Sequence, residues 1–135
     1  MSQKKSDDYK LITRHTVKQS DLNVRGTLFG GVMLSWIDEA GYVFASEICG
    51  CSNLVTVSMK NVDFKSPAKI GDILELHGKF VKIGITSITI IVKANTFSPI
   101  DIKNNRQIIE CEMTFVKIGK NDKPVAINYA KRKIK

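Results

Sequence analysis

The sequence predicts an α+β fold in which an antiparallel sheet wraps around one long central helix. Residues 29–48 form a long apolar run without proline, which favours a buried helix. The segments after residue 53 alternate apolar and polar side chains, as strands do, and short turns separate them. With 135 residues, 43% of them hydrophobic, the chain is expected to form a single domain (residues 1–135) with one core over about residues 9–129 and mobile, basic ends.

The helix is predicted over residues 29–48, and Gly50 follows as the usual stop residue. Only Asp38, Glu39 and Glu47 are charged within it, so apolar side chains surround most of its circumference. One sheet covers only one side of such a helix. We therefore expect a second copy of the chain to hide the remaining face, which makes the protein at least a homodimer.

Strands are predicted before and after the helix. The first covers residues 9–17; the others cover residues 54–64, 73–82, 86–95 and 107–118, and a short closing strand is expected at 124–129. Short connections favour an antiparallel meander. Within residues 54–64 the apolar parity changes between Met59 and Val62, which indicates a bulge near Lys60 and Asn61.

Composition narrows the functional classes. The net charge of +8, from 21 basic and 13 acidic residues, would suit nucleic acid, a membrane face or a phosphorylated small molecule. No basic stripe with interleaved aromatic residues is present, no uncharged run reaches the roughly 20 residues of a membrane span, and the first residues are too polar for a signal peptide. The three cysteines lack metal-ligand spacing. We expect a cytoplasmic protein without a metal, a nucleic-acid partner or a membrane partner.

Three features around the helix start suggest chemistry. The amide of Asn23 can hold a water or a carbonyl oxygen, the Gly30-Gly31 pair exposes backbone N–H groups, and Asp38 can activate water or attack directly. Eight helical residues separate Gly30 from Asp38, or roughly 12 Å along the axis. One acyl carbonyl cannot touch both in a single chain, so a shared site would take Asp38 from one subunit and Gly30 from another.

Each feature also has an ordinary structural explanation. Asn23 can be a turn residue, Gly30-Gly31 can be only a tight start to the helix, and Asp38 can face solvent or pair with a lysine. The three together are more specific than any one of them.

The motifs SDLNVRGTLFGG at residues 20–31 and WIDEAG at residues 36–41 resemble the signature of hotdog-fold acyl-coenzyme A thioesterases. Further matches are VTV at 55–57, DF and SP at 63–64 and 66–67, IGD at 70–72, GITSI at 84–88 and TFV at 114–116. The resemblance covers about residues 10–128 and implies a hotdog fold, hydrolysis of an acyl-coenzyme A thioester, and a dimer that can assemble further into a tetramer or into a hexamer, a trimer of dimers.

The resemblance also implies roles for individual residues. Asp38 would be general base or nucleophile, Asn23 would orient water or substrate across the interface, and the Gly30 N–H, helped by Gly31, would polarise the carbonyl. Substrate and coenzyme A contacts would come from Phe29, Lys65, Ser66, Thr86 and Ser87. Many relatives have an arginine where this chain has Ile85, and Lys82 could replace it as a phosphate partner. No cofactor is implied, because coenzyme A is part of the substrate.

Two other functions stay open at this point. A non-catalytic acyl-coenzyme A-binding protein would use the same fold, and a hotdog dehydratase would act on hydroxyacyl thioesters. The dehydratase chemistry generally uses a histidine with a carboxylate, and neither His15 nor His77 is expected near the helix motif. The sequence leaves the acyl chain length open.

Overall fold

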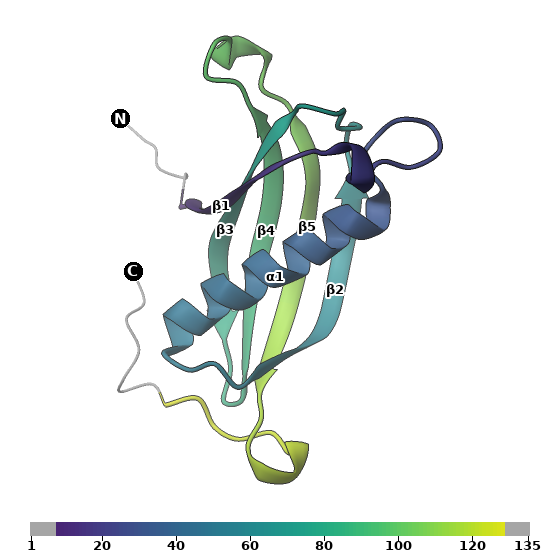
Figure 1. The fold of residues 1–135 in the computed structure, drawn as a ribbon. Helices are drawn as coiled ribbons and strands as arrows, with labels where there is room; N and C mark the ends of the chain where they lie inside the picture. Colours follow the sequence, from purple (N-terminus) through teal and green to yellow (C-terminus); the bar gives the residue numbers. More distant parts are fainter. Residues whose placement is uncertain (1–7, 129–135) are drawn as a thin grey trace, which may run out of the picture.

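The computed structural model describes residues 8–128. The long elements are β1 (Lys10–Thr16), α1 (Gly30–Cys49), β2 (Leu54–Phe64), β3 (Ile73–Ile83), β4 (Ser87–Phe97) and β5 (Gln107–Lys117). Short 3-10 turns lie at Gln19–Asp21, Ile102–Asn104 and Lys120–Asp122. Helix α1 runs diagonally across one face of the sheet (Figure 1). The predicted mobile ends lie outside the described residues.

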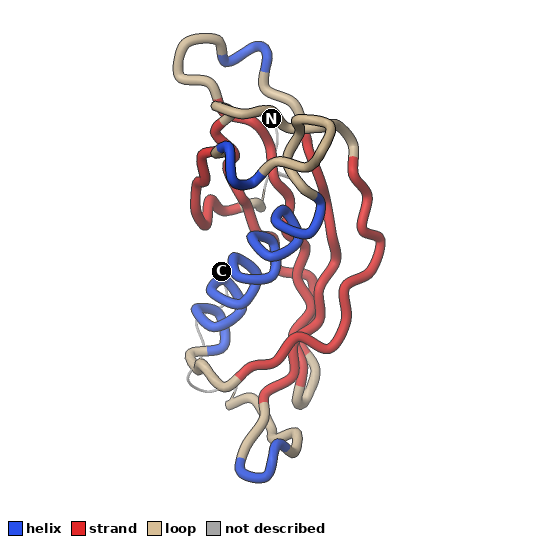
Figure 2. Tube along the Cα trace, turned by 45° about the vertical axis from the view of Figure 1, so that its right-hand side comes forward, coloured by secondary structure: helices blue, strands red, loops and turns tan. Residues whose placement is uncertain are grey.

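The five strands form one antiparallel sheet in the order β1-β3-β4-β5-β2, which confirms the predicted fold class. The sheet curves around the helix, as the turned view shows (Figure 2). Its inner face is built by the alternating side chains that the sequence indicated, all fully buried: Ile88, Ile90, Val92 and Ala94 on β4, and Ile109, Cys111, Met113 and Phe115 on β5.

The predicted meander is wrong for β2, which pairs with β5 and not with β3. The crossover (residues 65–72) carries the chain from one edge of the sheet towards the other (Figure 1). At its start the Lys65 N–H donates to the Ile108 carbonyl on β5, and at its end the Val17 N–H, next to β1, donates to the Asp72 carbonyl. Hydrogen bonds at both ends therefore hold the crossover in place across the end of the sheet. A hairpin would instead have placed β3 directly beside β2.

The predicted closing strand is also wrong. Pro124 makes a single bridge to Ile118, and residues 125–128 belong to no strand; Tyr129 lies outside the described residues. Proline has no N–H to donate, and the preceding turn holds Asn121 and Asp122 at positive φ, so a regular ladder does not start there.

The helix has the predicted boundaries within one residue. Phe29 is its N-cap, and Gly50 ends it in the left-handed conformation with a φ of 67°. No kink interrupts the 20 residues. Its buried side packs on the inner face of the sheet through Met33, Ile37, Ala40, Gly41, Phe44, Ala45 and Ile48.

The fully exposed side of the helix is less apolar than predicted. The solvent-exposed stripe of α1 is mostly polar, with Ser35, Glu39 and Glu47 beside one apolar residue, Val43. Four further apolar side chains of α1 are only half-buried against the core: Val32, Leu34, Trp36 and Tyr42. Exposed apolar side chains gather instead on the edge strand β2 and beside it: Phe29, Val55, Val57, Val62 and Phe64.

Strand β2 contains the predicted bulge. Its register against β5 shifts between Lys60 and Asp63, where Asn61 has a φ of 53°, and shifts a second time between Thr56 and Ser58. Such shifts increase the local twist of a strand. Over residues 8–128 no helix has the length and apolar character needed to cross a bilayer.

Candidate active site

Asp38 lies on α1, and its side chain is directed at the first part of β2. The Thr56 hydroxyl donates a hydrogen bond of 2.7 Å to its Oδ1. Asp38 is half-buried and Thr56 is exposed at the sheet edge, so the carboxylate is fixed by one bond and still open to solvent. It is not paired with a lysine in the described part of the chain.

Sequence reasoning missed Thr56 as a site residue. The VTV motif at 55–57 contributed to the resemblance, but nothing in it says which of its side chains meets the helix. A hydroxyl on a half-exposed strand is an unremarkable signal. Only the packing of α1 on β2 places that hydroxyl against Asp38.

The start of α1 forms the second candidate feature. The first intrahelical bond runs from the Met33 N–H to the Phe29 carbonyl, 3.1 Å, so the N–H groups of Gly30 and Gly31 have no acceptor within the helix. Phe29 offers no side-chain cap. Two exposed rings border this helix mouth: an ideal Cβ on Gly30 would lie 3.7 Å from Phe64, and one on Gly31 would lie 3.1 Å from Phe29.

Asn23 holds the loop that leads into the helix. Its Oδ1 accepts the N–H groups of Arg25, at 2.8 Å, and Thr27, at 3.1 Å, and its Nδ2 donates to the Thr27 hydroxyl at 3.0 Å. Gly26, with a φ of 83°, completes the turn. The amide oxygen is thus occupied by the loop, and the second Nδ2 hydrogen is the group that Asn23 can offer to another molecule.

The structure does not bring Asp38 and Gly30 together within one chain. Both belong to the same unbroken helix, so the roughly 12 Å between them along its axis holds. Asp38 is tied to the beginning of β2 at Thr56, and Gly30 lies near its end at Phe64.

The residues proposed to contact coenzyme A fall at two ends of the sheet. Ser66 follows β2, and the end of β2 lies near the start of α1; Ser87 is the first residue of β4, which begins at the opposite end of the sheet (Figure 1). Lys65 is bonded to Ile108 near one end of β5, and Ser87 pairs with Val116 near the other end. These two levels are about eight residues apart along the strand, which separates Lys65 and Ser66 from Thr86 and Ser87 by roughly 25 Å. One chain cannot place both around one nucleotide head.

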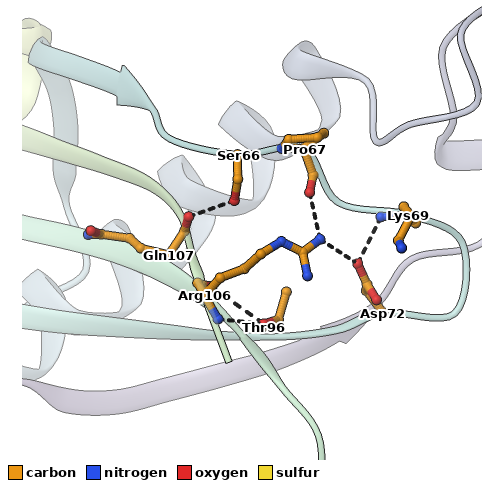
Figure 3. Close-up of polar contacts among 7 residues, drawn as sticks. All are labelled: Ser66, Pro67, Lys69, Asp72, Thr96, Arg106 and Gln107. Atoms are coloured by element: carbon orange, nitrogen blue, oxygen red, sulfur yellow. Dashed lines mark hydrogen bonds and ion pairs between the residues drawn. The ribbon is translucent and has the colours of Figure 1, made fainter. Parts of the chain in front are cut away.

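Their side chains differ in how free they are. Lys65 is exposed and lies 2.7 Å from Asp63, whose hydrogen bond raises the pKa of the ammonium group. The Ser66 hydroxyl donates to the Gln107 carbonyl at 2.8 Å and so helps to anchor the crossover (Figure 3). Lys82 is exposed near the end of β3.

At the other end, the Gly84 N–H donates to the Ser87 carbonyl at 2.7 Å and the Lys117 N–H donates to the Thr86 carbonyl at 2.9 Å. These bonds between backbone groups fix the turn between β3 and β4. The side-chain hydroxyls of Thr86 and Ser87 take no part in them. Ile85, in the turn between β3 and β4, is exposed.

One histidine does lie against the helix, contrary to the sequence-based expectation. The His15 ring stacks on Trp36 with a centroid separation of 4.3 Å, and burial lowers its pKa. Residues two apart on a helix diverge by about 200°, so Trp36 and Asp38 face opposite ways. His77 lies 3.8 Å from Glu75 on the sheet. Neither histidine is placed to work with Asp38.

No cluster of His, Cys, Asp and Glu side chains within residues 8–128 has the geometry of a metal site. The three cysteines of the described chain form no disulfide: Cys49 and Cys111 are buried and Cys51 is half-buried. Burial raises the pKa of the Cys111 thiol to about 11, so it is protonated and inert at neutral pH.

Comparison with known proteins places this geometry in a family. The family model of the Thioesterase superfamily matches residues 25–96, and the chain belongs to this superfamily. The matched part holds the helix mouth, Asp38 and Thr56.

Curated relatives include an uncharacterized acyl-CoA thioester hydrolase of Buchnera aphidicola, 35% identical over 59% of this chain and 58% of the relative. The acyl-CoA thioester hydrolase YciA of Escherichia coli is 32% identical over 59% of this chain and 60% of its own length. The chain thus matches under two thirds of the length of these curated relatives.

Solved structures agree over a larger part of the chain. A hexameric thioesterase from Yersinia pestis superposes with a TM-score of 0.80 at 27% identity, covering 88% of this chain and 95% of that one. An acyl-CoA hydrolase of Staphylococcus aureus, in complex with butyryl coenzyme A, coenzyme A and coenzyme A disulfide, gives a TM-score of 0.79 at 28% identity, covering 90% and 73%.

Proposed function

We propose that this protein hydrolyses acyl-coenzyme A thioesters to the free acid and coenzyme A, in a site shared between two subunits. The observation that carries the proposal is the placement of Asp38. Thr56 fixes its carboxylate at one end of β2, and the open N–H groups of Gly30 and Gly31 lie near the other end, too far away to share a carbonyl within one chain.

A two-fold axis across β2 would join the two halves. β2 is an edge strand, and the exposed valines Val55, Val57 and Val62 favour burial against another surface. Antiparallel pairing of two β2 strands sets the Thr56 end of one beside the Phe64 end of the other. Asp38 of one subunit then meets the helix mouth of its neighbour. At the other edge, β1 is only 7 residues long and carries Lys10 and Arg14, which suits it less to pairing.

The same two-fold axis would bring together the proposed coenzyme A contacts of the two subunits. Ser87, Val116 and Val55 are level with one another on β4, β5 and β2. Across an antiparallel β2 pair, this level of one subunit faces the Lys65–Ser66 end of the other. Lysine and hydroxyl donors from both chains would then surround the phosphates, and the ammonium groups of Lys65 and Lys82 would supply positive charge.

In the reaction we propose, the Asp38 carboxylate removes a proton from a water that attacks the thioester carbon, or attacks that carbon itself. The carbonyl oxygen becomes negative and is held by the Gly30 N–H, with Gly31 beside it. The carbon–sulfur bond breaks, and the thiolate of coenzyme A takes up a proton. On the general-base route this step gives the free acid directly. On the nucleophilic route it gives a mixed anhydride between the acyl group and Asp38, which a water then hydrolyses to release the acid and restore the carboxylate. The free Nδ2 hydrogen of Asn23 would orient the water or the substrate.

Relatives support these assignments. Solved structures of the Staphylococcus aureus hydrolase include alanine mutants of an asparagine, an aspartate and a threonine. The asparagine and the aspartate lie 15 residues apart, the separation of Asn23 and Asp38 here. The Yersinia pestis thioesterase is hexameric, which supports a trimer of dimers for this chain. We also infer a cytoplasmic location, where fatty acyl-coenzyme A is metabolised.

The test measures the rate of hydrolysis of a series of acyl-coenzyme A thioesters, from acetyl to palmitoyl. A thiol reagent detects the coenzyme A that is released. The wild type should release thiol, and Asp38→Asn, which keeps the shape of the side chain, should lose about a thousandfold in kcat. Binding of acyl-coenzyme A without thiol release would support the non-catalytic binding protein. Full activity of Asp38→Asn would refute the mechanism.

A further inference from the structure

Arg106, the residue before β5, holds the crossover (residues 65–72) in place. Its Nη2 donates to the Pro67 carbonyl at 2.7 Å and lies 3.3 Å from Oδ2 of Asp72 (Figure 3). The same carboxylate oxygen accepts the Lys69 N–H at 2.8 Å. One guanidinium group therefore connects both ends of the tight turn within the crossover.

The backbone of Arg106 is itself held in place by hydrogen bonds. Its N–H donates to the Thr96 hydroxyl at 2.9 Å, and the Thr96 N–H donates to the Arg106 carbonyl at 2.9 Å. Thr96 is buried with 7% of its surface exposed. The guanidinium thus extends from a rigid point on the central strands, so the position of the crossover is set by the sheet.

The crossover in turn holds the segment that leads into α1. Ala68 follows Pro67 directly, and its carbonyl accepts the Leu28 N–H at 2.8 Å; a β-bridge joins Thr27 and Lys69 alongside. Ala68 and Leu28 are both buried. Only Phe29 lies between Leu28 and Gly30, so a displacement of the Ala68 carbonyl is passed on to the helix mouth.

We propose that Arg106 is a positioning residue for the helix mouth. By fixing the Pro67 carbonyl, it fixes the Ala68 carbonyl and the Leu28 amide, and thereby aims the Gly30 N–H at the thioester oxygen. This inference rests on the proposed hydrolysis. Removing the guanidinium leaves the Pro67 carbonyl without this donor and the Asp72 carboxylate with the Lys69 N–H alone, and the crossover relaxes.

A direct role is the alternative, because the partly exposed guanidinium of Arg106 could also contact a phosphate of coenzyme A. Thioesters of N-acetylcysteamine separate the two roles, since they carry the acyl group and the sulfur but no nucleotide. A displaced helix mouth lowers kcat for both kinds of thioester. A lost phosphate contact raises KM for the coenzyme A thioester alone.

The experiment compares Arg106→Met and Arg106→Lys with Arg14→Met, the matched control. Arg14 also pairs with a carboxylate, Glu75 at 2.8 Å, but it lies on β1, and its side chain makes no hydrogen bond or ion pair with the described residues 65–72. Kinetics use the best acyl-coenzyme A of the chain-length series and the N-acetylcysteamine thioester of the same acid. Amide hydrogen exchange of the peptide that contains Leu28 is measured on the free proteins and does not depend on activity.

Arg106→Met should lower kcat about tenfold to a hundredfold for both thioesters. Arg106→Lys, which keeps the charge and can reach one acceptor, should lie in between, and it alone carries the test if Arg106→Met does not fold. The Leu28 amide should exchange about tenfold faster in Arg106→Met. Arg14→Met should match the wild type in both measurements.

Three results would overturn the proposal. The first is a kcat of Arg106→Met within twofold of the wild type, and the second is an effect of that substitution only on KM for the coenzyme A thioester. The third is a loss in Arg14→Met as large as in Arg106→Met. If the wild type hydrolyses no thioester, the proposed function fails and the catalytic role of Arg106 fails with it. The exchange rate of Leu28 then still decides, separately, whether Arg106 holds the helix start.

Discussion

The Thr56 hydroxyl donates a 2.7 Å hydrogen bond to Oδ1 of Asp38 and thereby joins the edge strand β2 to the middle of α1. The bond fixes one oxygen of the carboxylate and leaves the other available. A carboxylate held in this way has a defined direction, which general-base and nucleophilic catalysis both need.

Replacing Thr56 tests whether this orientation matters. Thr56→Val keeps the shape of the side chain but removes the donor, so kcat should fall about tenfold or more, which corresponds to about 1.4 kcal/mol in the barrier. Thr56→Ser keeps the hydroxyl and should retain most of the activity. Steady-state kinetics on both variants provide the comparison. Equal rates in the valine and serine variants would mean that the bond has no part in turnover.

The backbone N–H of Gly30 can be removed without disturbing the helix. Gly30 is the first helical residue, a position where proline is favoured, and its N–H has no intrahelical acceptor. Gly30→Pro should therefore fold normally while kcat falls about a hundredfold.

Gly30→Ala is the control, because it keeps the N–H and its Cβ makes an ordinary 3.7 Å contact with Phe64. It should lose much less activity than the proline variant. If both variants turn over substrate equally, the Gly30 N–H does not stabilise the oxyanion. Circular dichroism on each variant confirms that the helix persists.

The sequence allowed the helix, its glycine stop and the bulge near Asn61 to be predicted, because each follows from local periodicity and backbone preference. The strand order could not be predicted in this way. β2 lies beside β5 because the two strands form a long ladder, from Leu54 opposite Lys117 to Phe64 opposite Ile109, and residues 65–72 give no local sign of this long-range pairing.

The residues of the candidate site could likewise be predicted only in part from the sequence. Asn23, Gly30 and Asp38 could be selected from the sequence because their residue types carry the chemistry. The partner of Asp38 could not, since the direction of the Thr56 hydroxyl depends on how the helix crosses the sheet. The exposed apolar side chains on β2 could not be predicted for the same reason: the packing of helix and sheet decides which faces stay exposed.

The packing of the helix on the sheet predicts different costs for two glycine substitutions. An ideal Cβ on Gly78 would lie 2.7 Å from the Phe44 ring and 3.0 Å from Ile12, both part of the packed layer between helix and sheet. Gly78→Ala should therefore lower the free energy of unfolding by about 1–3 kcal/mol.

Gly41→Ala is the matched comparison. Its Cβ would meet the Met113 sulfur at 2.7 Å and the edge of the Phe115 ring at 3.3 Å. Methionine is flexible and can move away, and the ring needs to shift by only a few tenths of an ångström. Alanine also favours the helix over glycine by about 1 kcal/mol, which offsets the remaining strain. Urea unfolding of both variants should rank Gly78→Ala as clearly less stable. The reverse ranking would contradict the described packing of Phe44.

The measurement that tests the shared site most directly is turnover by mixed subunits. Asp38→Asn and Gly30→Pro chains are unfolded together, refolded and assayed beside each variant alone. If Asp38 of one subunit works with Gly30 of its neighbour, each mixed dimer regains one intact site, and the mixture should recover about a quarter of the wild-type activity. A mixture no more active than the two variants alone, although mass spectrometry shows that mixed dimers have formed, would contradict the account.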